Sequence, residues 1–174
     1  MRYHLQDHGG TASARNRGVE LAAGDYLAFI DQDDIWMPEK LELQFAALTG
    51  QPQPDVVFGH VQQFISPEVD GETASRLRCA PVPVPGILPT TMLVSRLAFE
   101  RVGRFDAHWR IGEWSNWYVR AVESGIRMLV LPEVVARRRL HARNKGRVQR
   151  DRLSEYPQLL KASLDRRRAR STDE

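Results

Sequence analysis

Cysteine and long apolar runs are the scarcest features of this 174-residue chain. Its one cysteine, Cys79, excludes an internal disulfide and any zinc site built from several cysteines. No window approaches the ~20 continuous apolar residues that span a bilayer, and the N-terminus "MRYHLQDHGG" lacks the apolar core of a signal peptide. The hydrophobic content of 42% is enough for one core, and the near absence of cysteine fits a reducing, cytoplasmic setting.

The net charge of +3 conceals an uneven distribution. Residues 137–174 carry 13 Lys/Arg against 5 Asp/Glu, a net +8, whereas residues 1–136 carry 12 against 17, a net −5. A basic tail of this kind either binds an anionic partner, such as the lipid of the inner membrane face, or forms a solvated, Arg-rich helix. Nucleic acid is the least favoured partner, because the tail lacks interleaved aromatics and any known binding motif. We expect a main domain at 1–146 and a basic helical tail at 147–174.

Strand and helix patterns alternate along the chain. Short apolar or β-branched runs predict strands at 26–30, 55–65, 91–95, 127–131 and 134–140. Helix-forming composition and helix-end signals predict helices at 11–24, 38–50, 96–102 and 113–125, with a polar helix from Asp151 onward. The Pro- and Gly-containing segment 66–89 predicts a loop. The alternation indicates an α/β layered fold.

Two of these helices have a predicted buried face made of apolar residues at helical spacing. In the helix at 38–50 the face consists of Leu41, Phe45 and Leu48. In the tail helix it consists of Leu153, Leu160 and Leu164.

Three carboxylates, Asp31, Asp33 and Asp34, stand at the end of the apolar run "YLAFI". In open α/β sheets, ligands bind beyond the carboxyl ends of parallel strands, which is where such a run would place them. Clustered carboxylates repel one another unless a cation neutralises them, and Mg²⁺ or Mn²⁺ take oxygen ligands while retaining positions for phosphate oxygens. The cluster therefore predicts a metal clamp for a phosphorylated substrate. The alternative is that Asp33 or Asp34 caps the helix that opens at Pro38.

The block "GGTASARNRGVELAAGDYLAFIDQDDIWMPEKLELQ" resembles the central part of the family 2 inverting glycosyltransferases of the GT-A fold. It combines the "ARN" triplet, the "A-x-G-D-Y" turn, the D-x-D-D carboxylates and the "W-x-P-x-K-L-x-x-Q" helix in the family's order and spacing. The similarity continues through "LVSRLAFERVGRFD" and "GEWSNWYVRA" and ends at "RRRLHARN", which covers 9–144 but not the basic tail. The resemblance implies a GT-A α/β fold, a mixed sheet flanked by helices, and sugar transfer from a nucleotide-diphosphate donor.

The resemblance also assigns roles to single residues. Asp33 would be the leading metal ligand, with Asp31 or Asp34 contacting the donor ribose or the ion. Arg15, in "ARN", corresponds to a basic position near the donor nucleotide, where a guanidinium holds phosphate oxygens at two points. His141 corresponds to a C-terminal histidine of the metal or diphosphate site. The residues alone leave alternatives open: a helix-surface ion pair for Arg15 and a surface position for His141.

An inverting transfer also needs a carboxylate that takes the acceptor's proton while a metal stabilises the departing diphosphate. The family supplies this base from a Glu-Asp pair that opens a helix. Here Glu113 is present, but Trp114 stands where the Asp is usual, and Asn116 holds another position that is often acidic. We therefore predict Glu113 as the catalytic base, the alternative being a helix-start Glu stabilised by the helix dipole. Nearby, Trp109, Trp114 and Trp117 form either a platform for a sugar or lipid acceptor or part of the core.

Family members open with a strand–helix–strand–helix portion that carries an acidic residue for the nucleobase. This chain starts at "MRYHLQDHGG", where that portion would already be complete, so we expect a fragment, a misassigned gene start or a truncated relative. The strand at 26–30 would then have an exposed edge through which the chain could self-associate. Two hypotheses follow: a metal-dependent transferase with a glycan, lipid or small-molecule acceptor, or a non-catalytic module that binds a partner.

Overall fold

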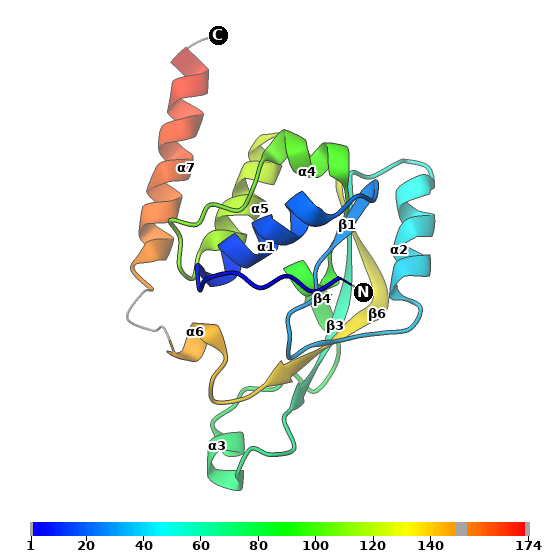
Figure 1. Ribbon diagram of the computed structural model, residues 1–174, viewed down its shortest axis with the longest axis vertical. Helices are drawn as coiled ribbons and strands as arrows, with labels where there is room; N and C mark the ends of the chain where they lie inside the picture. The colour runs from blue at the N-terminus through cyan, green and yellow to red at the C-terminus, as the bar shows by residue number, and fades with distance from the viewer. Residues whose placement is uncertain (1, 149–152, 173–174) are drawn as a thin grey trace.

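The computed structural model of the protein describes residues 2–148 and 153–172, which form a mixed sheet between two layers of helices (Figure 1). The strands are β1 (Tyr26–Ala28), β2 (Ile35–Trp36), β3 (Val56–Ile65), β4 (Val84–Gly86), β5 (Leu93–Ser95) and β6 (Met128–Leu140). The helices are α1 (Gly10–Leu21), α2 (Lys40–Thr49), α3 (Gly71–Ser75), α4 (Arg96–Val102), α5 (Glu113–Glu123), α6 (Lys145–Val148) and α7 (Glu155–Thr172), with a 3₁₀ turn, η1, at Pro89–Thr91. The predicted start of the tail helix, Asp151, lies outside the described residues. Within the described ranges, no helix is long and apolar enough to cross a bilayer.

Three strands of the sheet run in the same direction. The strand order is β1-β5-β3-β6-β2, with β4 paired to β3 beside this path. β3 and β6 form a parallel pair, whereas β5 is antiparallel to both β1 and β3. We expected the strand at 26–30 to be a parallel strand of the sheet. Its pairing is not parallel, because β5 lies between β1 and β3, but β1 does run in the same direction as β3 and β6. The predicted α/β fold with a mixed sheet is confirmed. β1 is an end strand of the path, and self-association through its edge stays a prediction.

β6 is one long strand where the sequence predicts two. It pairs with every residue of β3, with register shifts on both sides of His60. The shifts fall near Pro132, which has no N–H to donate to a sheet. The chain bulges there and then continues in the same direction. Gly59 is required opposite this bulge, because a Cβ at that position would lie 2.5 Å from Val135 Cγ1.

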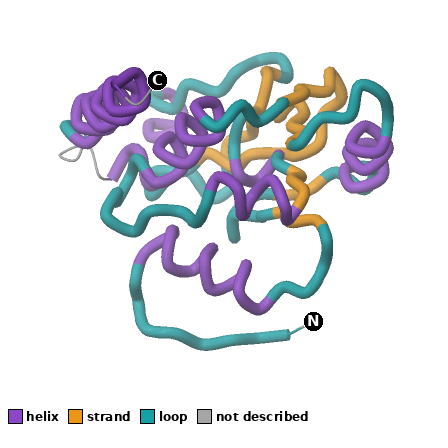
Figure 2. The backbone as a smooth tube through the Cα atoms, turned by 90° about the horizontal axis from the view of Figure 1, so that it is seen from above, coloured by secondary structure: helices purple, strands orange, loops and turns teal. Residues whose placement is uncertain are grey.

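The sheet has an apolar layer on each face, because side chains alternate along its strands. On one face, Phe58 of β3 belongs to a cluster that includes Phe99 of α4 and Trp117 of α5. On the other face, Val57 packs with Leu48 of α2. Figure 2 shows the strands between α2 and the remaining helices. The functional residues described below lie at one end of this layered core.

Helix α2 faces the sheet with different residues from those predicted. Leu48 is buried as expected, but Leu41 and Phe45 are 46% and 48% exposed. Lys40 and Gln44 are turned inward instead, with exposures of 1% and 0%. The predicted apolar face was therefore wrong for two of its three members.

A buried hydrogen-bond network explains this orientation of α2. The Gln44 side-chain amide donates to the backbone carbonyls of Val57 (2.8 Å) and Thr91 (2.7 Å). Lys40 Nζ donates to Gln44 Oε1 and to the Met92 carbonyl. These bonds satisfy buried carbonyls that leucine side chains would leave without a donor. The Lys and Gln of the "W-x-P-x-K-L-x-x-Q" pattern thus hold α2 against β3 and η1.

The segment 66–89, predicted as a loop, contains two regular elements. One is the short helix α3, and the other is β4, which pairs with the middle of β3. The N-terminus of α3 is capped by Asp70, whose carboxylate accepts a hydrogen bond from the Thr73 N–H at 2.8 Å. The loop prediction is therefore wrong at both elements.

The tail helix α7 also buries a different side from the one predicted. Leu159 is buried at 6% exposure. The leucines of the predicted face are exposed: Leu153, Leu160 and Leu164. The orientation of α7 follows from its contact with α5, where Arg166 Nε lies 2.8 Å from Glu123 Oε2. Leu159, Ser163 and the ion pair of Arg166 therefore lie on the side of α7 that faces the domain.

The buried position of Lys40 predicts a rise in stability at high pH. Burial lowers the pKa of Lys40 from 10.5 to about 8, so the unfolded chain binds more protons than the folded chain between these values. The free energy of unfolding should therefore increase as pH rises from 8 to 10.5, on the order of 3 kcal/mol at about 1.4 kcal/mol per pKa unit. Lys40→Met lacks the titrating group and should not show this increase. Denaturant titrations of both proteins across that window measure the difference, and identical pH profiles would contradict it.

Candidate active site

The turn after β1 holds the three aspartates predicted to form a metal clamp. Its backbone closes through the Asp34 N–H, which donates to the Asp31 carbonyl at 3.1 Å. Arg139 of β6 fastens the turn, since its backbone N–H donates to Asp34 Oδ1 (3.1 Å) and its Nε donates to the Asp33 carbonyl (3.0 Å). The N-cap of α2 is Glu39, so the capping alternative for Asp33 and Asp34 is excluded.

His141 follows β6 directly and contacts the same turn. Its Nε2 lies 2.9 Å from Asp33 Oδ2, across a separation of 108 residues. Its Nδ1 accepts a hydrogen bond from the Arg143 backbone N–H at 3.1 Å. Because Nδ1 accepts, Nε2 carries the proton in this arrangement and donates it to Asp33. The two predicted metal ligands are therefore adjacent, and binding of a cation through Nε2 would require the other tautomer of His141, with its proton on Nδ1.

The charge of the turn suits a cation that is held together with a phosphorylated ligand. Burial raises the pKa of Asp34 to about 6; the hydrogen bond from the Arg139 N–H opposes the rise, and the charges of Asp31 and Asp33 add to it. A cation among these carboxylates would favour their charged forms. Within the described ranges, no three His, Cys, Asp or Glu side chains are grouped closely enough to hold a metal by themselves. Mg²⁺ commonly uses one or two carboxylates and takes its remaining ligands from substrate phosphates and water, so the donor set fits.

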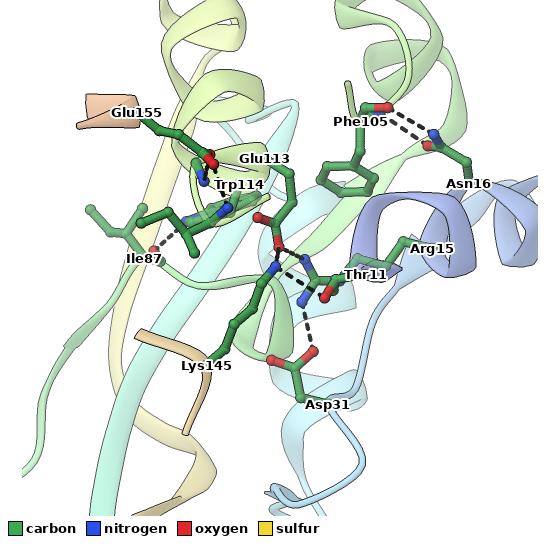
Figure 3. Close-up of polar contacts among 12 residues, drawn as sticks. Thr11, Arg15, Asn16, Asp31, Ile87, Phe105, Glu113, Trp114, Lys145 and Glu155 are labelled. Atoms are coloured by element: carbon green, nitrogen blue, oxygen red, sulfur yellow. Dashed lines mark hydrogen bonds and ion pairs between the residues drawn. The ribbon is translucent and has the colours of Figure 1, made fainter. Parts of the chain in front are cut away.

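Arg15 of α1 links the aspartate turn to helix α5 (Figure 3). Its Nη2 lies 2.6 Å from Asp31 Oδ1, and its Nη1 lies 3.5 Å from Glu113 Oε1. The neighbouring Asn16 exchanges two hydrogen bonds with the backbone of Phe105, at 2.7 and 3.0 Å. The "ARN" triplet therefore has one residue that faces the site and one that fixes α1 in place.

Glu113, the predicted catalytic base, is the first residue of α5 and is 4% exposed. Lys145 Nζ, from α6, lies 2.9 Å from Glu113 Oε1 and 3.1 Å from Thr11 Oγ1. Two cations, Lys145 and Arg15, thus lie beside the same carboxylate oxygen. Glu113 Oε2 is buried and has no hydrogen-bond partner among the described residues. The carboxylate is ion-paired through Oε1, whereas Oε2 faces no hydrogen-bond donor among the described residues.

The three tryptophans near Glu113 have different positions. Trp109 and Trp117 are buried, at 8% and 0% exposure, and Trp117 belongs to the core cluster. Trp114 stacks on Trp117 with ring centroids 5.5 Å apart, and its Nε1 donates to the Ile87 carbonyl at 2.9 Å. The core interpretation therefore holds for Trp109 and Trp117, whereas Trp114 lines the pocket described next.

The candidate residues line one pocket of about 920 Å³. They are Arg15, Asp31, Asp33, Asp34, Glu113 and His141. They come from α1, the turn after β1, the start of α5 and the end of β6. β1 and β6 run in the same direction, so the segments that follow their carboxyl ends meet at one edge of the sheet. The structure thus brings the six residues together, while their chemical roles stay predictions.

Sequence reasoning missed other residues of this pocket, among them Arg139, Lys145 and Tyr156. The run "RRRL" before His141 was a usable signal for Arg139, because alternate residues of a strand share a face. Arg139 and Arg137 do share one, and both guanidinium groups lie within 5 Å of the Phe64 ring centroid, at 4.9 and 4.8 Å. For Lys145 and Tyr156 the local sequence offered no pattern, since both reach the pocket through tertiary packing.

Arg15→Ala should destabilise the fold, because it removes a cation from the nearly buried Glu113. We expect the free energy of unfolding to fall by roughly 2–3 kcal/mol, below the full cost of isolating a buried charge, since Lys145 remains. Arg17→Ala is the matched control: it lies on the same helix, and its pair with Glu20 is solvent-exposed. Urea denaturation of both variants measures the contrast. Equal losses in the two variants would show that the Arg15 contacts carry no special stability.

Comparisons with known proteins show the family of the chain. A model of the family described as "Glycosyl transferase family 2" matches residues 2–120. An uncharacterized glycosyltransferase of Rickettsia typhi is 24% identical over 170 residues, which cover 90% of this chain and 52% of that protein. The UDP-Glc:alpha-D-GlcNAc-diphosphoundecaprenol beta-1,3-glucosyltransferase WfgD of Escherichia coli is 46% identical over 39 residues, 22% of this chain and 15% of WfgD. The chain thus spans about half the length of the first relative and a smaller share of the second.

A solved structure shares the fold. The S. aureus protein TarS 1-349, crystallised in complex with UDP, superposes with a TM-score of 0.56 at 17% identity, covering 77% of this chain and 41% of that one. A likeness at this identity shows the GT-A fold alone. The family model, by contrast, matches more than half of the chain across the aspartate turn, α1 and most of α5. The chain therefore belongs to glycosyl transferase family 2.

Proposed function

We propose that this chain is the catalytic portion of a glycosyltransferase that moves a sugar from a nucleoside-diphosphate donor to an acceptor by a metal-dependent, inverting displacement. The observation that carries the proposal is the convergence of six predicted residues on one pocket, in a chain of this family. Two relatives support the donor class: TarS was crystallised with UDP, and WfgD is named for a UDP-glucose donor. In both names the nucleotide is uridine diphosphate, which makes UDP the probe of choice.

The donor's diphosphate would bind beside the aspartate turn and Arg15, which line the same pocket. Asp33, with His141, would hold a Mg²⁺ or Mn²⁺ ion, and Asp31 and Asp34 would contact the ribose or the same ion. When bound, such an ion neutralises the charge that develops on the departing diphosphate. Arg15 supplies a permanent positive charge beside the turn, where its guanidinium pairs with Asp31 at 2.6 Å.

Glu113 would take the proton of the acceptor hydroxyl as the acceptor oxygen attacks the anomeric carbon. Its Oε1 is engaged by Arg15 and Lys145, so Oε2 is the oxygen available for this proton. The two cations fix the orientation of the carboxylate before the acceptor binds. Lys145 thereby acts as a positioning residue.

A second candidate function is a module that binds the nucleotide without turning over the sugar. The observation that favours it is the burial of Glu113, at 4% exposure, beside Trp114, which stands where an acid is usual. In such a module Glu113 only joins α1, α5 and α6. The two functions differ in turnover but not in nucleotide binding, so they are separated by the two experiments below.

Nucleotide binding should depend on a metal. UDP should bind to the chain in the presence of Mn²⁺ and lose most of its affinity when a chelator is added, as isothermal calorimetry can measure. Asp33→Ala should abolish the effect of the metal while leaving the fold intact, because Asp33 lies in a turn and not in the core. Asp25→Ala is the matched control at the opposite end of β1, and it should bind UDP as the parent does. Equal affinity with and without metal would contradict the clamp.

Glu113→Gln should separate chemistry from binding. The amide is nearly isosteric but cannot accept a proton, so UDP affinity should persist while UDP release from a UDP-sugar falls by about 10²–10⁴-fold. Glu123→Gln, which alters another ion-paired acid of α5, should lower stability without lowering turnover per folded molecule. If the Glu113→Gln variant turns over within about threefold of the parent, a residue other than Glu113 is the catalytic base. A parent that binds UDP but releases none from any UDP-sugar would favour the binding module.

A further inference from the structure

Helix α7 is attached to the domain along one side only. Glu155 Oε2 accepts hydrogen bonds from the backbone N–H groups of Arg110 (2.8 Å) and Ile111 (3.0 Å), just before α5. Further along, Arg166 pairs with Glu123 at 2.8 Å. Leu159 lies between these two anchors and is buried. The position of α7 along the edge of the molecule is visible in Figure 1.

Beside this buried side, α7 exposes a strip of large apolar residues. Tyr156, Leu160 and Leu164 are 44%, 61% and 42% exposed. A step of four residues advances about 40° around an α-helix, so the three side chains form one continuous strip. Leu153, just before the helix, is 52% exposed as well. Isolated exposed leucines are common on protein surfaces, but an ordered strip of them marks a contact surface.

Positive charge borders this apolar strip. Lys161 follows Leu160 by one residue and Arg168 follows Leu164 by four, which places both on the flank that points away from the domain. Arg167 lies in line with the strip itself. One acid lies on the same flank: Asp165 follows Lys161 by four residues and precedes Arg168 by three, so it offsets part of this positive charge. The outer surface of α7 therefore has an apolar line, with three basic side chains and one acidic side chain on or beside it and a positive net charge.

An anionic lipid surface complements this pattern. A helix that lies in the plane of a membrane inserts an apolar strip between the headgroups, while flanking Lys and Arg side chains bind the phosphates. A second copy of the chain is a poorer occupant, because pairing strip against strip would bring the basic residues of both copies together. Charge thus favours lipid over self-association at this surface.

We propose that α7 docks the chain onto an anionic membrane surface through Tyr156, Leu160 and Leu164, with Lys161 and Arg168 on the headgroups. Tyr156 both begins the strip and lines the active-site pocket. Docking through this strip therefore brings the mouth of the pocket to the lipid surface. This orientation requires no span across the bilayer and does not depend on sugar transfer.

Vesicle co-flotation of the full chain tests this proposal. Vesicles of phosphatidylglycerol mixed with phosphatidylcholine should bind the protein at low salt, and vesicles of phosphatidylcholine alone should bind it much more weakly. Leu160→Gln/Leu164→Gln removes the apolar strip without changing charge and should weaken binding more than about tenfold. Lys161→Gln/Arg168→Gln should also weaken it more than about tenfold, since each basic residue near an anionic surface contributes roughly fivefold. Leu97→Gln, at a leucine that is 79% exposed on α4, is the matched control and should bind as the parent does.

Several results would overturn the proposal. Failure of the parent to bind anionic vesicles would do so, as would equal binding to both kinds of vesicle. The same holds if the Leu160→Gln/Leu164→Gln variant binds like the parent while its circular dichroism is unchanged. The parent could instead form a concentration-dependent dimer and fail to bind vesicles. If the Leu160→Gln/Leu164→Gln variant then does not dimerise, the strip is a contact surface for a second copy of the chain.

Discussion

The parallel pairing of β3 with β6 is the constraint on which the rest of the site depends. It holds over all of β3 despite the bulge near Pro132, and it carries the chain without a break to His141. The same strand supplies Arg139, whose backbone and side chain fasten the aspartate turn. Residues 31–34 and 139–141 are far apart in the sequence. They meet because β2, which follows the aspartate turn, pairs with β6 at Ile35 and Arg137, and because β6 runs beside β3 to its end. A shift in this register would separate His141 from Asp33.

Ion pairs complete the site around this framework. Arg15 contacts carboxylates from two elements, and Lys145 adds a second cation to Glu113. A buried charge is stable only when it is paired, so these contacts fix α1, α5 and α6 relative to one another. The same groups have the chemistry to bind a diphosphate and to take a proton. Stability and the proposed function therefore rest on the same few side chains.

The sequence predicted the fold class, the position of most elements and six of the residues that line the pocket. This was possible because the apolar runs end at the functional residues, and because the order of motifs resembles a known family. The inward faces of the helices were harder to predict. Lys40 and Gln44 are buried because they satisfy backbone carbonyls of β3 and η1, and no periodicity of apolar residues reports such bonds. The protonated Nε2 of His141 likewise depends on a backbone N–H that only the folded turn supplies.

The central claim is that the aspartate turn and the end of β6 form one nucleotide–metal site. Anomalous diffraction from crystals grown with UDP and Mn²⁺ tests it most directly, because manganese is located independently of the model of the protein. The account predicts a manganese peak beside Asp33, with His141 and the diphosphate of UDP around it. UDP bound in this pocket without manganese at the turn, or manganese and UDP bound elsewhere on the protein, would contradict the account.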